Sequence, residues 1–199
     1  MFYMHQKEAL YYERFEDNLL QCKLCPHECI IKDGFTEICK VRKNINGKLY
    51  SLVYKKAIAV KIDPIEKKPL YHFLPGSKTL SLGSIGCNLK CLHCQNYDIS
   101  QIENDKIFKE MKTINYEEII SLAKKQHCKS ISFTYNEPTI SIETILELSR
   151  IAKKNNLKTV LVTNGFINQK PLKDILPFID AINIDLKSFN TEFYKKICG

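Results

Sequence analysis

Short apolar runs alternate with amphipathic segments from Lys78 to the end of the chain, and this order constrains the fold more than any other feature of the sequence. We predict strands at residues 79–83, 130–134, 159–163 and 181–185, and helices at about residues 116–125, 140–154 and 171–178. Strands that alternate with helices predict a parallel sheet with right-handed crossovers. The sequence therefore predicts an α/β fold.

Local patterns support two of the predicted helices. Asn115 and Glu118 have the spacing of a capping box at the start of 116–125. The segment 140–154 is amphipathic, with its apolar residues on one side. The residues expected to be buried there are Ile142, Ile145, Leu146, Leu148, Ile151 and Ala152.

Three cysteines follow the first predicted strand in the spacing C-x3-C-x2-C, at Cys87, Cys91 and Cys94. Three thiolates on one short loop suit three irons of a [4Fe–4S] cubane and leave the fourth iron open to another molecule. Thiolates also bind zinc, but zinc normally takes a fourth Cys or His, and His93 lies too close to Cys94 in sequence to serve well. Zinc with a distant fourth ligand and unligated structural cysteines are the alternatives to an open cluster.

This loop resembles that of the radical S-adenosylmethionine (SAM) superfamily, whose C-x3-C-x2-C motif follows the first strand of a partial (β/α) barrel. The resemblance implies a [4Fe–4S] cluster whose open iron binds SAM. It also implies that one electron, from a donor such as flavodoxin or ferredoxin, splits SAM into methionine and a 5′-deoxyadenosyl radical that abstracts hydrogen. The cofactor would carry out the difficult chemical step, and the protein would hold the cofactor and the substrate in position.

Polar residues follow the second predicted strand as well, and enzymes built on parallel barrels place their chemistry at such strand ends. Asn136 and Glu137 lie where many radical SAM enzymes have Gly-Gly-Glu-Pro, which holds the SAM ammonium. Tyr135 and Asn136 replace the two glycines, although Asn136 and Glu137 still offer oxygen acceptors. The alternative is a turn that starts a helix, with Glu137 in the first turn.

The third and fourth predicted strands end in runs that resemble motifs of the activases of glycyl-radical enzymes. In those enzymes a Thr-Asn-Gly run, here Thr163 and Asn164, lies near the SAM ribose. An Asp-x-Lys run, here Asp185 and Lys187, contributes to SAM or cation binding. Each short run is weak evidence alone, with a turn or a solvated face as the alternative, but their shared position at strand ends supports one cofactor site.

Segments along most of the chain, at residues 24–29, 71–77, 86–96, 133–139 and 183–189, resemble the radical SAM component of the AmmeMemoRadiSam system. Members of that family are similar to pyruvate formate-lyase activating enzymes. The superfamily usually has six βα units, whereas this sequence ends just after the fourth predicted strand. We therefore expect a partial barrel that is truncated after that strand.

A second group of cysteines, Cys22, Cys25, Cys29 and Cys39, lies near the N-terminus. Four thiolates within eighteen residues can close around one zinc ion or an auxiliary cluster, because thiolates bind both. One alternative is that His27 replaces one thiolate as a ligand. The other is that the four cysteines are reduced and purely structural.

The sequence divides at about residue 75. Residues 1–75 are predicted to form an N-terminal Cys-rich extension with short strands, and residues 76–199 the radical SAM core. Alternating apolar positions in residues 48–62 predict a small antiparallel piece within the extension.

The net charge of +8 comes from 30 basic residues, of which Arg14, Arg42 and Arg150 are the arginines. Nucleic-acid readout depends strongly on arginine, so lysine-rich solvated faces are the favoured interpretation and nucleic-acid binding is disfavoured. A basic surface also suits an acidic electron donor. A protein that carries the hydrogen to be abstracted is a predicted partner.

Residues 1–20 mix charged with apolar residues, which disfavours a signal peptide, and no apolar run is long enough to cross a membrane. Nine cysteines without an export signal are typical of metal ligands or reduced thiols. A cytoplasmic radical enzyme is the leading hypothesis. The alternative is a non-catalytic iron–sulfur or zinc protein that transfers electrons or acts as a scaffold.

Overall fold

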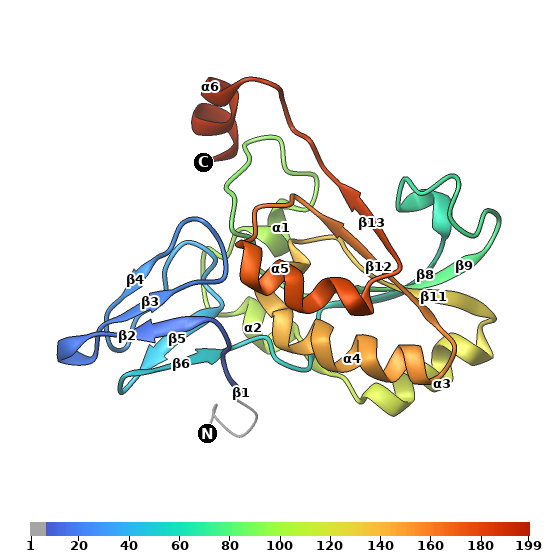
Figure 1. The fold of residues 1–199 in the computed structure, drawn as a ribbon, viewed down its shortest axis with the longest axis horizontal. Helices are drawn as coiled ribbons and strands as arrows, with labels where there is room; N and C mark the ends of the chain where they lie inside the picture. Colours follow the sequence, from blue (N-terminus) through green and yellow to red (C-terminus); the bar gives the residue numbers. More distant parts are fainter. Residues whose placement is uncertain (1–6) are drawn as a thin grey trace.

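The computed structural model describes residues 7–199, and residues 1–6 of the predicted extension lie outside the described part. Its central sheet has the strand order β13-β12-β11-β9-β8 (Figure 1). Four strands are parallel, namely β9 (Lys78–Gly83), β11 (Cys128–Phe133), β12 (Lys158–Thr163) and β13 (Ala181–Ile184). The predicted α/β fold with a parallel sheet is thus confirmed, whereas truncation of a barrel after the fourth strand stays a prediction.

Three helices lie over one face of this sheet: α3 (Tyr116–Lys125), α4 (Ile142–Lys154) and α5 (Gln169–Ile175) (Figure 1). A 3-10 turn, Leu176–Phe178, extends α5. The bounds predicted for α3 are confirmed, but α4 begins later than predicted because Pro138–Ser141 forms a separate 3-10 turn. Apolar side chains of α4 and of the strands, including Ile145, Leu148 and Ile131, are buried together in the main core.

The N-cap of α3 is Asn115, whose side-chain Oδ1 accepts hydrogen bonds from Glu117 N at 2.8 Å and Glu118 N at 3.2 Å. Asn115→Ala is expected to lower the free energy of unfolding by about 0.5–2 kcal/mol, because two helix N–H groups lose their acceptor. Denaturant unfolding measures this change. Asn115→Asp keeps an acceptor oxygen, so equal destabilisation by both substitutions would refute the capping role.

The N-terminal part consists of short strands beside this sheet (Figure 1). One small sheet contains β1 (Lys7–Glu8), β6 (Lys48–Ser51) and β5 (Arg42–Ile45), and another contains β2 (Tyr12–Arg14), β3 (Leu20–Cys22) and β4 (Ile30–Ile31). β7 (Lys56–Ala57) pairs with β10 (Lys112–Thr113). The remaining short helices are Glu16–Asn18, Ile65–Lys67, α1 (Tyr97–Ser100), α2 (Ile107–Glu110), α6 (Thr191–Phe193) and the π-turn Tyr194–Cys198.

One strand of the predicted extension joins the central sheet. β8 (Ala59–Pro64) pairs antiparallel with β9, from Ala59 opposite Gly83 to Pro64 opposite Lys78. The strands expected in residues 48–62 are therefore present, but they do not form one separate antiparallel piece. Since the sheet continues across residue 75, the division into 1–75 and 76–199 stays a prediction.

A buried ion pair also connects the N-terminal part to the helical layer. Arg42 Nη1 lies 3.0 Å from Glu143 Oε1, and both side chains are 1% exposed. The same carboxylate oxygen accepts a hydrogen bond of 2.8 Å from Leu10 N, and Arg42 Nη2 donates to Leu10 O. These contacts attach β5 and the segment after β1 to the first turn of α4.

Within residues 7–199, none of the helices combines the length and the apolar character that a membrane span requires.

Candidate active site

A cleft of about 720 Å³ opens where the parallel strands β9, β11, β12 and β13 end. Small-molecule sites typically have about 300–1,000 Å³, so this volume suits a ligand of cofactor size. The structure brings all residues predicted for the cluster and for SAM to this cleft. They are Cys87, Cys91, Cys94, Asn136, Glu137, Thr163, Asn164, Asp185 and Lys187.

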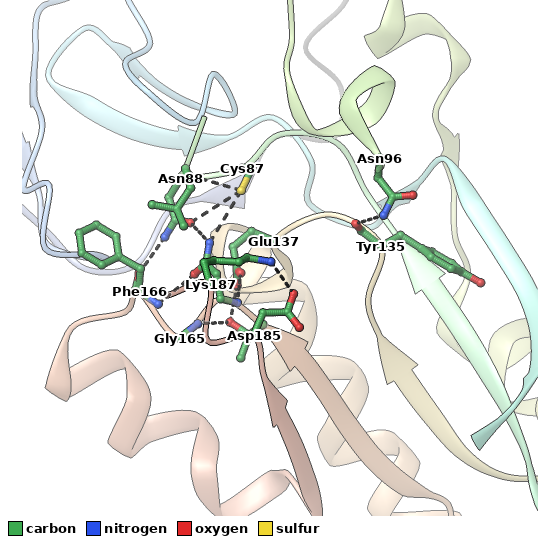
Figure 2. A network of polar contacts seen from close by, with 12 residues as sticks. Cys87, Asn88, Asn96, Tyr135, Glu137, Gly165, Phe166, Asp185 and Lys187 are labelled. Atoms are coloured by element: carbon green, nitrogen blue, oxygen red, sulfur yellow. Dashed lines mark hydrogen bonds and ion pairs between the residues drawn. The ribbon is translucent and has the colours of Figure 1, made fainter. Parts of the chain in front are cut away.

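The cysteine loop is held at both ends by residues that follow β11. Asn136 Oδ1 accepts from Ser84 N at 3.0 Å, and Asn136 Nδ2 donates to Gly86 O at 2.9 Å. At the far end, Asn96 Nδ2 donates to Tyr135 O at 2.8 Å (Figure 2). The Asn136 side chain is used for this support, which positions the backbone just before Cys87.

Asn136→Ala is expected to lower the free energy of unfolding by about 1–3 kcal/mol, because Ser84 N and Gly86 O would remain buried without their partner. Thermal or denaturant unfolding measures the loss. Asn96→Ala removes an exposed hydrogen bond and serves as the matched control, with an expected cost below about 1 kcal/mol. A larger loss from Asn96→Ala would contradict this assignment.

The Glu137 carboxylate connects the ends of β11 and β12. Glu137 is 3% exposed, and its Oε1 accepts from Thr139 N at 3.0 Å, Thr139 Oγ1 at 2.7 Å and Thr163 Oγ1 at 2.7 Å. Its Oε2 accepts from Asn164 N at 2.8 Å. Burial raises the pKa of Glu137, whereas the hydrogen bonds from Asn164 and Thr139 oppose that shift. Oε1 thus accepts three hydrogen bonds and Oε2 one, so Oε2 is the less used of the two carboxylate oxygens.

Asn88 and Asn164 link the cysteine loop to the loop after β12. Asn164 Nδ2 donates to Asn88 Oδ1 at 2.8 Å and lies 3.8 Å from Cys87 Sγ. Asn88 Nδ2 donates to Phe166 O at 2.7 Å, so the Asn88 side chain lies between the two loops (Figure 2). This network places the side-chain amide of Asn164 beside the Cys87 sulfur.

After β13, Lys187 and Asp185 pair with each other, with 2.9 Å between Lys187 Nζ and Asp185 Oδ2 (Figure 2). Both side chains are partly exposed. Lys187 lines the same cleft as the three cysteines, and its contact with a carboxylate of SAM stays a prediction.

Tyr135 occupies the first of the two positions where the related motif has glycine. Its φ is 77°, in the left-handed region that glycine adopts readily and bulky residues avoid. Tyr135 OH donates to Asp63 Oδ2 at 2.5 Å, and Lys68 Nζ lies 4.6 Å from the centre of its ring. These contacts with Asp63 and Lys68 hold Tyr135 at a positive φ, which a glycine at this position would adopt without such support.

The donor set of the cysteine loop fits a soft, positively charged centre. Burial raises the pKa of the Cys87 thiol to about 12 and of the Cys91 thiol to about 11, so forming these thiolates requires a compensating positive charge such as iron.

Cys91 packs with Leu89 and Cys198, and Lys90 N donates to Cys198 O at 2.6 Å. The C-terminal segment therefore covers one side of the loop.

The second cysteine group lies outside this cleft. Cys22, Cys25, Cys29 and Cys39 line a separate small cavity of about 20 Å³. In residues 7–199, no group of three or more His, Cys, Asp or Glu side chains is placed so that it could hold a metal ion, and this applies to both cysteine groups. In both, the thiols share a cavity, and binding would require their sulfurs to turn toward a common centre.

Four residues with supporting roles were not predicted from the sequence: Asn88, Asn96 and the pair Asp63 and Lys68. For Asn88 and Asn96, the sequence did offer one signal, because both asparagines lie in the segment that carries the three cysteines. Lys68 is 2% exposed and lies 2.8 Å from Asp63 Oδ2. No local pattern marks that pair, because its function depends on Tyr135, which is 72 residues from Asp63 in sequence.

Comparison with known proteins agrees with this geometry. Residues 82–199 match the model of the radical SAM superfamily. The chain is 48% identical over 193 residues to an uncharacterized protein of Methanocaldococcus jannaschii, which covers 96% of this chain and 56% of the relative.

Two relatives with named activities are more distant. Pyruvate formate-lyase 1-activating enzyme of Escherichia coli is 25% identical over 122 residues, covering 57% of this chain and 47% of that protein. A probable GTP 3′,8-cyclase of Methanococcus aeolicus is 29% identical over 119 residues, covering 57% of this chain and 38% of that protein. The chain thus spans between 38% and 56% of the length of these three relatives.

Proposed function

This chain belongs to the radical SAM superfamily, and we propose that it holds a [4Fe–4S] cluster through Cys87, Cys91 and Cys94 and binds SAM in the adjoining cleft. The observation that carries the proposal is the convergence of these cysteines with polar residues from three other strand ends on one cavity. When bound, the reduced cluster and SAM supply methionine and a 5′-deoxyadenosyl radical, which takes a hydrogen atom from the substrate.

The residues of the chain have distinct roles in this proposal. The three thiolates would hold a cluster and would leave one of its irons without a protein ligand, where SAM could bind. Glu137 would offer its carboxylate to the SAM ammonium through Oε2, which accepts one hydrogen bond, and Lys187 would offer a positive charge to the SAM carboxylate. Thr163 and Asn164, at the end of β12, line the part of the cleft proposed for the ribose. Asn136 and Asn88 hold the loops between which SAM would lie.

The proposed substrate is a protein partner that loses a hydrogen atom. Similarity to an activating enzyme supports this choice. Reduced flavodoxin or ferredoxin is the proposed source of the electron, and the excess of lysine on this chain suits their acidic surfaces. Membership of the AmmeMemoRadiSam family and a cytoplasmic location belong to the same proposal.

Electron paramagnetic resonance of the anaerobically reconstituted and reduced protein, with and without SAM, tests this function. We expect a reduced-cluster signal that changes when SAM is added. A signal indifferent to SAM would instead favour the non-catalytic electron-transfer alternative. Bound zinc with no cluster signal would exclude the radical mechanism.

Lys187→Ala is expected to weaken SAM binding by about tenfold, because a hydrogen bond to a charged group contributes about 1.5–3 kcal/mol and Lys187 is partly solvated. Titration of the cluster signal with SAM measures the affinity. Lys195→Ala is the matched control, because Lys195 is 70% exposed and pairs with Glu192 instead. Equal affinities in the two variants would argue against a role for Lys187.

A further inference from the structure

We propose that Cys22, Cys25, Cys29 and Cys39 bind a single zinc ion, and that this site supports the loop that carries Cys87. Cys22 ends β3, Cys25 and Cys29 lie in the turn between β3 and β4, and Cys39 precedes β5. Two separate loops thus bring four thiols to one cavity. All four are free thiols, so no disulfide competes for them.

The size of the cavity favours the smaller of the two metal centres that thiolates prefer. At about 20 Å³, it has room for roughly one water-sized atom. A single Zn²⁺ with four sulfurs at about 2.3 Å fits such a space once the side chains turn inward. A cubane of four irons and four sulfides requires a much larger opening between the same two loops.

The backbone beside the cysteines is held in conformations that point to a local constraint. Glu28, just before Cys29, has a φ of 45°, and Lys40, just after Cys39, has a φ of 61°. Residues other than glycine seldom adopt this region, and they remain there where the surrounding structure holds them. Cys22 N donates to Cys29 O at 2.9 Å, which closes the turn that presents the first three thiols.

The strands around the cysteines are short. β2, β3 and β4 contain three, three and two residues. Short strands can gain stability from a structural metal, whose binding free energy becomes folding free energy. A zinc ion would supply this stabilisation where the two loops meet.

The zinc site also lies directly behind the catalytic cysteine loop. The Cys39 carbonyl oxygen would be 2.6 Å from a Cβ at Gly86, the residue before Cys87, so the two loops are in close contact. His27, between Cys25 and Cys29, has its Nε2 2.7 Å from Asn88 O, and its ring packs edge-on against Phe166 at 4.9 Å. Asn88 in turn contacts Asn164, which lies beside the Cys87 sulfur.

The zinc site can be tested independently of SAM cleavage in the full chain carrying Cys87→Ser, Cys91→Ser and Cys94→Ser, which removes the catalytic donors. We expect about one zinc per chain by elemental analysis, and X-ray absorption should show four sulfur neighbours at about 2.3 Å. Iron and sulfide retained by this triple variant would overturn the assignment in favour of an auxiliary cluster. A triple variant without bound metal would overturn it as well.

Adding Cys25→Ser and Cys29→Ser to the triple variant should abolish zinc binding, whereas adding Cys128→Ser should not, because Cys128 is a buried thiol on β11 outside both groups. If the five-serine variant fails to fold, Co²⁺ titration of the metal-free triple variant replaces it. A tetrahedral cobalt–thiolate spectrum supports the site, and its absence refutes it.

The supporting role rests on the proposed function and has its own test. His27→Ala in the otherwise unchanged chain should retain zinc but lose cluster iron at least several-fold faster to a chelator, because Asn88 O loses its partner. An unchanged rate of iron loss with zinc retained would refute the support while leaving the zinc site intact.

Discussion

Cys91→Ala is expected to remove the [4Fe–4S] cluster, with a loss of about four irons per chain. SAM cleavage should fall by more than about a hundredfold, because changes to residues that merely support metal ligands already cost about 10- to 100-fold. The physical reason is that two remaining thiolates cannot hold a cubane against loss of iron to solvent. Iron and sulfide analysis, the cluster absorption and the yield of 5′-deoxyadenosine measure the result.

Two other buried cysteines provide matched controls for this substitution. Cys128 is 5% exposed on β11, and Cys198 is fully buried against Cys91 itself. Cys128→Ala and Cys198→Ala should both retain cluster iron, and Cys198→Ala also shows whether disturbed packing beside Cys91 is enough to release it. Equal iron loss in Cys91→Ala and Cys128→Ala would disprove the proposed ligand set.

Glu143→Leu is expected to lower the free energy of unfolding by about 3–5 kcal/mol, because it leaves the Arg42 guanidinium buried without its counter-charge. Leu10 N also loses its acceptor. This substitution should therefore detach the N-terminal strands from α4 and have one of the largest effects on stability in the chain. Denaturant unfolding followed by circular dichroism measures the loss.

The double variant Arg42→Met with Glu143→Leu is the control for charge burial. Replacing both partners of a buried ion pair by apolar residues is often neutral, so the double variant should be more stable than Glu143→Leu alone. The absence of a hydrogen-bond partner for Glu143 Oε2 and Arg42 Nε among the described residues favours that outcome. A double variant that is less stable than Glu143→Leu alone would contradict this, and would show that the hydrogen bonds of the Arg42 side chain stabilise the fold even without Glu143.

Most of the central sheet and its helices could be predicted from local patterns. The bounds of α3 match the prediction because Asn115 caps the helix through N–H groups only two and three residues away. The order of strands and helices also predicted that the ends of the parallel strands would lie together, which is why the residues proposed for the cluster and for SAM line one cleft. Such features depend on neighbours in the chain or on topology, and both can be inferred from sequence.

The tertiary structure alone decided how those residues are used. Asn136 supports a backbone segment some 50 residues away, and Glu137 accepts hydrogen bonds from residues 26 and 27 positions later. β8 pairs with the central sheet although its sequence belongs to the N-terminal part. The sequence by itself determined the strand–helix order, the spacing of the thiols and which polar residues reach the strand ends. The hydrogen-bond partners of those residues, and the contact between the two cysteine groups, were decided only by folding, because pairings between distant segments leave no periodic pattern in the chain.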